Sequence, residues 1–96
     1  MSYARINTLT FVSEEVANTM QAHYASTAPE GFPEAEILTF VRTGPVNASI
    51  TSIYPDKVAF ERSAEERNRR MKENEGKIAS VQMQEGVVGL AHVKNK

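Results

Sequence analysis

Three side chains of this 96-residue chain combine reactive chemistry with an apolar setting: Arg67, His92 and His23. Arg67 stands in the middle of an apolar helical stripe, where a guanidinium could bind a carboxylate, a phenolate or an enolate. His92 follows Leu90 in an apolar run and His23 lies at the edge of another stripe, and histidine is well suited to accept protons near neutral pH. These three are the candidate catalytic residues, with Arg67 steadying an anion and either histidine accepting the proton.

Each of these side chains also has a purely structural interpretation. The stem of Arg67 could pack while its head reaches water or an acidic partner, and the histidines could be hydrogen-bonded core or interface residues. Four further side chains are candidates for binding a small apolar or aromatic ligand: Asn7, Tyr54, Phe60 and Met71. Asn7 shares a strand face with Arg5, and this polar pair could line a pocket or equally face solvent. A tyrosine is more often a core residue with a satisfied hydroxyl.

Composition excludes several classes of chemistry. The chain has no cysteine, which rules out disulfides, thiol nucleophiles and cysteine-ligated metal centres. The histidines and scattered carboxylates give no metal-site spacing, so we expect no metal and no cofactor. Basic side chains number 11 against 12 acidic ones, and there is no aromatic strand of the RNA-binding type, so we expect no nucleic-acid partner.

The apolar runs indicate a protein that does not enter a membrane. The N-terminus, Met-Ser-Tyr-Ala-Arg, has no basic region followed by a long apolar run, so it is not a signal peptide. No apolar stretch approaches the ~20 residues that cross a bilayer. We therefore expect a cytoplasmic location, no membrane partner and a single domain over residues 1–96.

The elements that must position these residues follow from hydrophobic patterning and helix caps. Ser13 and Asp56 are typical N-caps, and Gly76 suits a helix stop. The patterning predicts strands over 3–12, 37–42, 49–54 and 87–93, a helix from 13 that fades by 28, and a helix from 56 to about 74. The segment between the second helix and the last strand, 77–84, forms either a short strand, which we favour, or an extra helical turn.

The order β-α-β-β-α-β is the ferredoxin-like arrangement of the α+β class, in which two helices cover one face of a four-stranded antiparallel sheet. A sheet that leaves its other face to water alternates apolar and polar residues. Here the pairs Ile37-Leu38 and Val87-Val88 place large apolar side chains on opposite faces. A second copy of the chain is the simplest cover for that face, so we expect a homodimer.

With these elements in place, the chain resembles the dimeric α+β barrel superfamily, in particular the antibiotic biosynthesis monooxygenase-like domains. The resemblance covers nearly the whole chain and rests on its length, its element order and residues 48–57, where a strand ending in Tyr-Pro runs into the second helix. It implies that two sheets close face to face into a barrel, with a pocket between sheet and helices in each subunit. Some members oxidise aromatic polyketides without metal or flavin, and others degrade haem.

The resemblance also implies roles for particular residues. Polyketide oxidases place Asn, Trp, Tyr and Arg around the pocket. Asn7, Tyr54 and Arg67 could stand in for some of these, but the chain has no Trp, so the pattern is incomplete. Haem-degrading members use a Trp and a His near the second helix, and both are missing here. We therefore expect a cofactor-independent monooxygenase-like enzyme that acts on a small aromatic or polyketide-like compound, or, as the alternative, a non-catalytic ligand-binding or assembly domain of the same fold.

Overall fold

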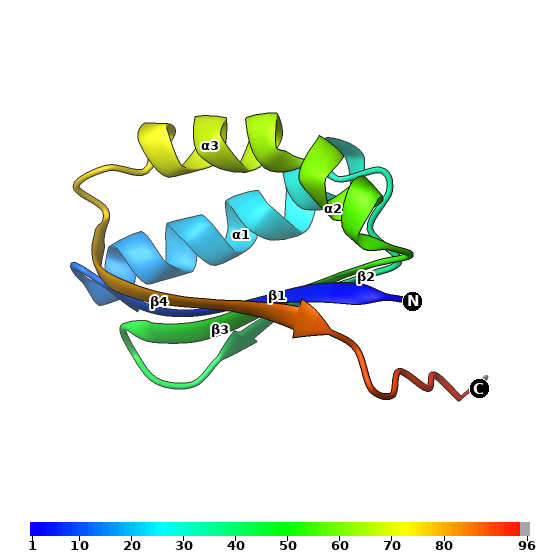
Figure 1. The fold of residues 1–96 in the computed structure, drawn as a ribbon. Coiled ribbons are helices and arrows are strands. Elements are labelled where there is room, and N and C mark those ends of the chain that lie inside the picture. The colour runs from blue at the N-terminus through cyan, green and yellow to red at the C-terminus, as the bar shows by residue number, and fades with distance from the viewer. Residues whose placement is uncertain (95–96) are drawn as a thin grey trace.

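One layer of the protein is a four-stranded antiparallel sheet, and helices cover one of its faces (Figure 1). The computed structural model describes residues 1–94. The strands are β1 (Tyr3–Phe11), β2 (Ile37–Arg42), β3 (Asn47–Tyr54) and β4 (Ile78–Val87), in the spatial order β2-β3-β1-β4. The helices are α1 (Glu14–Gly31), α2 (Lys57–Arg62) and α3 (Ala64–Glu73). This confirms the predicted ferredoxin-like fold of the α+β class.

Both long helical segments begin where the capping residues predicted. The Ser13 hydroxyl accepts a hydrogen bond from the Val16 amide at 3.1 Å, and Asp56 Oδ1 accepts one from the Ala59 amide at 2.7 Å. Helix α1 does not fade by residue 28 but continues through Pro29 to Gly31. Its last turn is closed beyond the proline by the hydrogen bond from the Phe32 amide to the Ala28 carbonyl.

The second helical segment is divided at Ser63, so the prediction of one continuous helix is wrong. The Ser63 hydroxyl donates to the Phe60 carbonyl at 2.6 Å, and the Ser63 amide donates to the same oxygen. A serine side chain that hydrogen-bonds the preceding turn competes with the regular backbone ladder. The break separates α2 from α3 and begins α3 at the turn that carries Arg67.

The last strand is β4, over 78–87, so the favoured strand over 77–84 is present and the strand predicted over 87–93 is wrong. Strand β1 offers pairing positions only from Tyr3 to Phe11, and β4 occupies them. After the hydrogen bond from the Val88 amide to the Ser2 carbonyl, the rest of the segment has no strand beside it and projects from the sheet (Figure 1). Residues 88–94 therefore have no regular structure, and Leu90 is 85% exposed.

The core lies between the helices and the sheet, in two clusters. One joins Leu9 and Phe11 of β1 to Ala17 of α1 and Ala48 of β3. The other joins Tyr54, Ala59 and Phe60, where β3 turns into α2.

The opposite face of the sheet carries no charged side chain in its paired strand positions. It is formed by Ile, Val, Thr, Ser, Ala, Asn and Gln side chains, because the cross-strand register puts every paired Arg and Glu on the helix-covered face. Ile6 is 41% exposed there and Val41 53%. Within residues 1–94, no helix is long and apolar enough to cross a membrane.

Candidate functional site

A half-open pocket lies between the helical layer and the sheet, and its floor is the helix-covered face of β1 and β3. Its cavity volume is about 100 Å³. The apolar part of the wall includes Leu9, Met20, Tyr24, Phe32 and Ile50. Since an apolar cavity of about 150 Å³ accommodates benzene, a larger aromatic compound would extend through the mouth of this pocket.

Arg67 reaches the pocket from α3 and is held by the helix break. Its Nη1 donates to the Phe60 carbonyl at 2.9 Å and to the Ser63 hydroxyl. The guanidinium carbon lies 4.0 Å from the centroid of the Phe60 ring, a cation–π arrangement. Neutral groups alone therefore fix this guanidinium, and no carboxylate within residues 1–94 forms a salt bridge with it.

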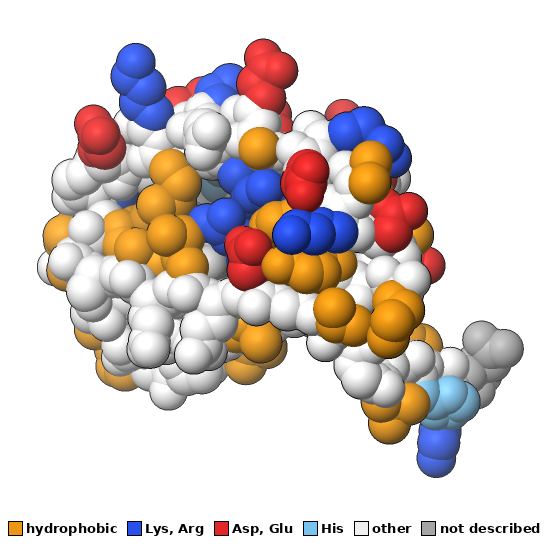
Figure 2. Space-filling view, in the orientation of Figure 1, with side chains coloured by type: hydrophobic (Ala, Val, Ile, Leu, Met, Phe, Trp, Pro, Cys, Tyr) orange, Lys and Arg blue, Asp and Glu red, His pale blue; other side chains and the backbone are white. Residues whose placement is uncertain are grey.

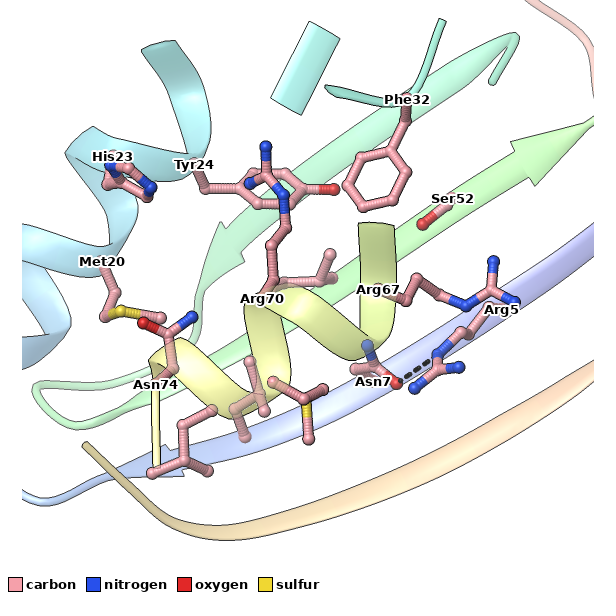
Figure 3. A pocket seen from close by; sticks show the side chains of 14 residues that line it. Arg5, Asn7, Met20, His23, Tyr24, Phe32, Ser52, Arg67, Arg70 and Asn74 are labelled. Carbon is pink, nitrogen blue, oxygen red and sulfur yellow. Dashed lines mark hydrogen bonds between the residues drawn. The ribbon is translucent and has the colours of Figure 1, made fainter. Parts of the chain in front are cut away.

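Arg5 reaches the same end of the pocket from β1 (Figure 3). Its Nε donates to Asn7 Oδ1 at 3.3 Å, and its Nη2 contacts the Met83 sulfur. Burial, followed by the positive charge of Arg67, lowers the pKa of Arg5. The two guanidiniums are therefore close enough to repel each other.

A third arginine in the wall, Arg70, differs from these two because it has an acidic partner. Its Nε lies 2.6 Å from Glu66 Oε2, and its guanidinium carbon lies 5.0 Å from the Phe32 ring centroid. Hydrogen bonds from Arg69 and Arg70 hold the pKa of Glu66 below its ordinary value. Arg70 thus lines the pocket with its charge neutralised by Glu66.

The pocket brings together four of the residues singled out from sequence: Arg67, His23, Asn7 and Met71. His23 stands on α1 at the end of the pocket away from Arg5 (Figure 3). His92 does not join them, because it belongs to the exposed segment that follows β4. Within a single chain it lies outside the pocket.

Tyr54 and Phe60 lie in the core rather than among the pocket-lining residues, which corrects their expected place. They are 1% and 5% exposed, and their ring centroids are 5.6 Å apart. Both rings point into the core, where they pack against each other and against Ala59. Phe60 still acts on the site indirectly, through its carbonyl and its ring beneath Arg67.

Sequence reasoning missed Arg70 and Tyr24 as site residues, and it named Arg5 only as the partner of Asn7 on one strand face. The signal for Arg5 was its position two residues before Asn7, which puts both on one strand face. Arg70 follows Arg67 by three residues, a spacing that shares a helix face. Tyr24 belonged to a helical stripe, and burial raises the pKa of its phenol. Across residues 1–94, no three histidine, aspartate or glutamate side chains gather in a group that could hold a metal ion.

No family model and no curated protein matches this chain. Solved structures do match it over nearly its whole length. A candidate antibiotic biosynthesis monooxygenase from Bacteroides thetaiotaomicron superposes with a TM-score of 0.74 at 14% identity, covering 99% of this chain and 96% of its own. A dimeric ferredoxin-like protein from an uncultured marine organism gives 0.77 at 10% identity, with coverages of 98% and 93%.

A third solved structure is SnoaB of Streptomyces nogalater, described as a cofactor-independent oxygenase. It superposes with a TM-score of 0.72 at 12% identity, and the match covers 94% of this chain and 95% of SnoaB. At these identities the likeness establishes the fold alone. The chain shares its ferredoxin-like fold with these three proteins, one of them a candidate antibiotic biosynthesis monooxygenase, in line with the resemblance that its sequence indicated.

Proposed function

We propose that this protein is a cofactor-independent oxygenase-like enzyme that acts on a small aromatic or polyketide-like compound bound in the pocket between α3 and the sheet. The observation that carries the proposal is the Arg67 guanidinium, aligned by the Phe60 carbonyl and ring yet not neutralised by a carboxylate. A fixed positive charge beside an apolar wall stabilises an anion that develops on an aromatic substrate. The fold shared with SnoaB supports the same class of reaction by analogy.

In the proposed mechanism His23 removes a proton from an acidic C–H or O–H of the substrate, and Arg67 stabilises the resulting carbanion, enolate or phenolate. Such an electron-rich anion can pass one electron to dioxygen, and the radical pair then joins to form a C–O bond. Protonation by His23 gives a hydroperoxide, which loses water to leave a carbonyl. For anthrone the balance is one dioxygen consumed, one water released and one anthraquinone formed.

This proposal is tested with a panel of one-, two- and three-ring phenols and anthrones, with and without a carboxylate. Oxygen uptake is followed with an electrode, and the quinone by its absorbance. We expect at least one member to be oxidised by the protein faster than by buffer alone. If no member is oxidised, the enzymatic proposal is contradicted.

The alternative is a non-catalytic domain that binds a small ligand. The cavity of about 100 Å³ favours it, because the volume suits a small group better than a polycyclic compound. Thermal-shift measurements on the same panel separate the two functions. Stabilisation by a panel member that is never oxidised would identify a binding domain.

We also infer that the protein acts as a homodimer joined through the uncharged face of the sheet. Exposed Ile6 and Val41 on a face without charged side chains, together with a dimeric protein among the structural matches, support this arrangement. Light scattering should give twice the 10.6 kDa mass of one chain. Ile6→Lys should shift the mass toward the monomer, and Val58→Lys, at an exposed position of α2, should not.

A further inference from the structure

Two guanidiniums that are not neutralised share one end of the pocket. Arg5 projects from the sheet and Arg67 from the helix above it, so they border the same space from two layers (Figure 3). Neither forms a salt bridge with a carboxylate of residues 1–94, whereas their neighbour Arg70 does. Arg5 and Arg67 are both partly buried, and a guanidinium that has no carboxylate partner in such a setting can bind an anionic ligand.

The hydrogen-bond donors of these two side chains are only partly used. Arg5 uses Nε for the hydrogen bond to Asn7 and Nη2 for the contact with the Met83 sulfur. Arg67 uses Nη1 for its hydrogen bonds to the Phe60 carbonyl and the Ser63 hydroxyl. The remaining guanidinium nitrogens, Arg5 Nη1 with Arg67 Nε and Nη2, find no acceptor in the part of the chain that the structure describes. The existing contacts hold both guanidiniums in place and leave some of their N–H donors free to bind a ligand.

One acidic side chain, Glu85, acts on Arg5 without forming a salt bridge, and its negative charge opposes the lowering of the pKa of Arg5 by burial and by Arg67. Glu85 of β4 is the cross-strand partner of Arg5, but its Oε1 accepts the Tyr3 hydroxyl at 3.0 Å. It lies beyond salt-bridge distance of both Arg5 and Arg67. In the space-filling view, Lys and Arg side chains lie beside the hollow together with Asp and Glu side chains, and hydrophobic side chains border it (Figure 2). With the two guanidiniums of Arg5 and Arg67 against the single carboxylate of Glu85, this end of the pocket keeps a net positive charge next to apolar surface.

We propose that the pocket takes an organic acid, with the carboxylate bound between Arg5 and Arg67 and an apolar or aromatic body lying toward Met20 and Tyr24. A carboxylate is planar and accepts hydrogen bonds in pairs, which matches the fork of a guanidinium. The mostly apolar remainder of the wall suits a hydrocarbon body rather than a polyphosphate or a sugar. This inference rests on the site of the proposed function and narrows its substrates to acids.

Binding can be measured without any turnover, so the inference stands or falls separately from the oxygenase proposal. The probes are benzoate and 2-naphthoate, compared by calorimetry with the neutral isosteres benzamide and 2-naphthamide. We expect each acid to bind the wild-type protein at least tenfold more tightly than its amide, because hydrogen bonds to charged groups are the stronger ones. Equal affinities for acid and amide, or no binding of either acid at millimolar concentration, would overturn the inference.

Arginine variants then locate the carboxylate. Arg5→Gln and Arg67→Gln should each weaken 2-naphthoate binding about tenfold and leave 2-naphthamide binding little changed. Arg62→Gln is the matched control, because it removes the same charge from an exposed position paired with Glu34 outside the pocket. If a Gln variant fails to fold, Arg5→Lys and Arg67→Lys keep the charge but lose the fork. Unchanged acid affinity in the folded variants at both positions contradicts the inference.

The outcomes for the two proposals remain distinguishable. Acids that bind through Arg5 and Arg67 but are never oxidised leave this inference standing and contradict only the oxygenase proposal. Oxidation of neutral phenols as efficient as that of their carboxylated analogues overturns this inference and leaves the oxygenase proposal intact.

Discussion

The Arg67 guanidinium lies 4.0 Å from the centre of the Phe60 ring and donates a hydrogen bond to the carbonyl of the same residue. Phe60 thus fixes both the orientation of the Arg67 guanidinium and its distance from the core. Phe60 is buried by its own packing against Tyr54, so Arg67 is positioned by the core of the domain rather than by a surface ion pair.

We expect Phe60→Leu to loosen Arg67 and to lower the free energy of unfolding by about 1–2 kcal/mol, through lost apolar area and a lost cation–π contact. Urea unfolding measures the stability, and calorimetry with 2-naphthoate measures the site. Val81→Ala is the control, because it removes apolar volume next to the other core cluster. Weakened naphthoate binding in both variants alike would show that general destabilisation, and not the placement of Arg67, is responsible.

The two histidines should differ in their effect on turnover. His23 lines the pocket and His92 stands on the exposed segment after β4. With any panel member that the wild type oxidises, His23→Gln should lower kcat at least tenfold, and His92→Gln should leave it unchanged. The reverse result would contradict the assignment of His23 as the base and would indicate that the segment 88–94 reaches the pocket of a second subunit.

The ion pair between Glu66 and Arg70 should raise stability only above acid pH. The pKa of Glu66 is held below the ordinary value of 4.5 by hydrogen bonds from Arg69 and Arg70. Its contribution is therefore present above the unfolded pKa and disappears as the pH falls through the folded pKa. Glu66→Gln should be less stable than the wild type near neutral pH in urea unfolding, and the difference should vanish toward the acid limit.

Glu65→Gln is the control for this pH dependence. Glu65 is exposed on the same helix and forms no salt bridge within residues 1–94. Its stability difference from the wild type should stay small at every pH. A Glu66→Gln difference that persists in acid would contradict the role assigned to the ion pair.

Glu66→Gln should also change ligand binding in a definite direction. Removing the acidic partner of Arg70 leaves a third positive charge in the pocket wall. We expect 2-naphthoate to bind several-fold more tightly to this variant, with 2-naphthamide little affected. Weaker naphthoate binding would show that the main effect of Glu66 is to hold Arg70 in position and not to neutralise its charge.

Local signals in the sequence were enough to predict the alternation of strands and helical segments, although not the division of the second helical segment. Ser13 and Asp56 mark helix starts because a cap depends only on the next three residues. The last strand was misplaced because two β-prone segments compete for one edge of β1, and only the register of the whole sheet decides between them. The helix break at Ser63 escaped prediction because a serine at a helical position carries no distinct sign of back-bonding.

The site was predicted only in part, for a related reason. Arg67 and His23 stand out by type and position, and the pocket contains both. Arg5 was placed correctly on the same strand face as Asn7, but periodicity does not say which face of a strand the helices cover. For the same reason, apolar spacing alone did not separate Phe60, which fills the core, from Met71, which lines the pocket.

We propose that dioxygen oxidises an anion bound by Arg67 without a cofactor, and the decisive measurement is the ratio of dioxygen consumed to quinone formed. The measurement uses chelator-treated, flavin-free protein and an anthrone without a carboxylate, so that Arg67→Gln removes only the contact to the developing enolate. We expect one dioxygen per quinone, a rate at least tenfold lower in Arg67→Gln and an unchanged rate in Arg62→Gln. Oxygen uptake no faster than autoxidation, or equal rates in the wild type and Arg67→Gln, would contradict the claim.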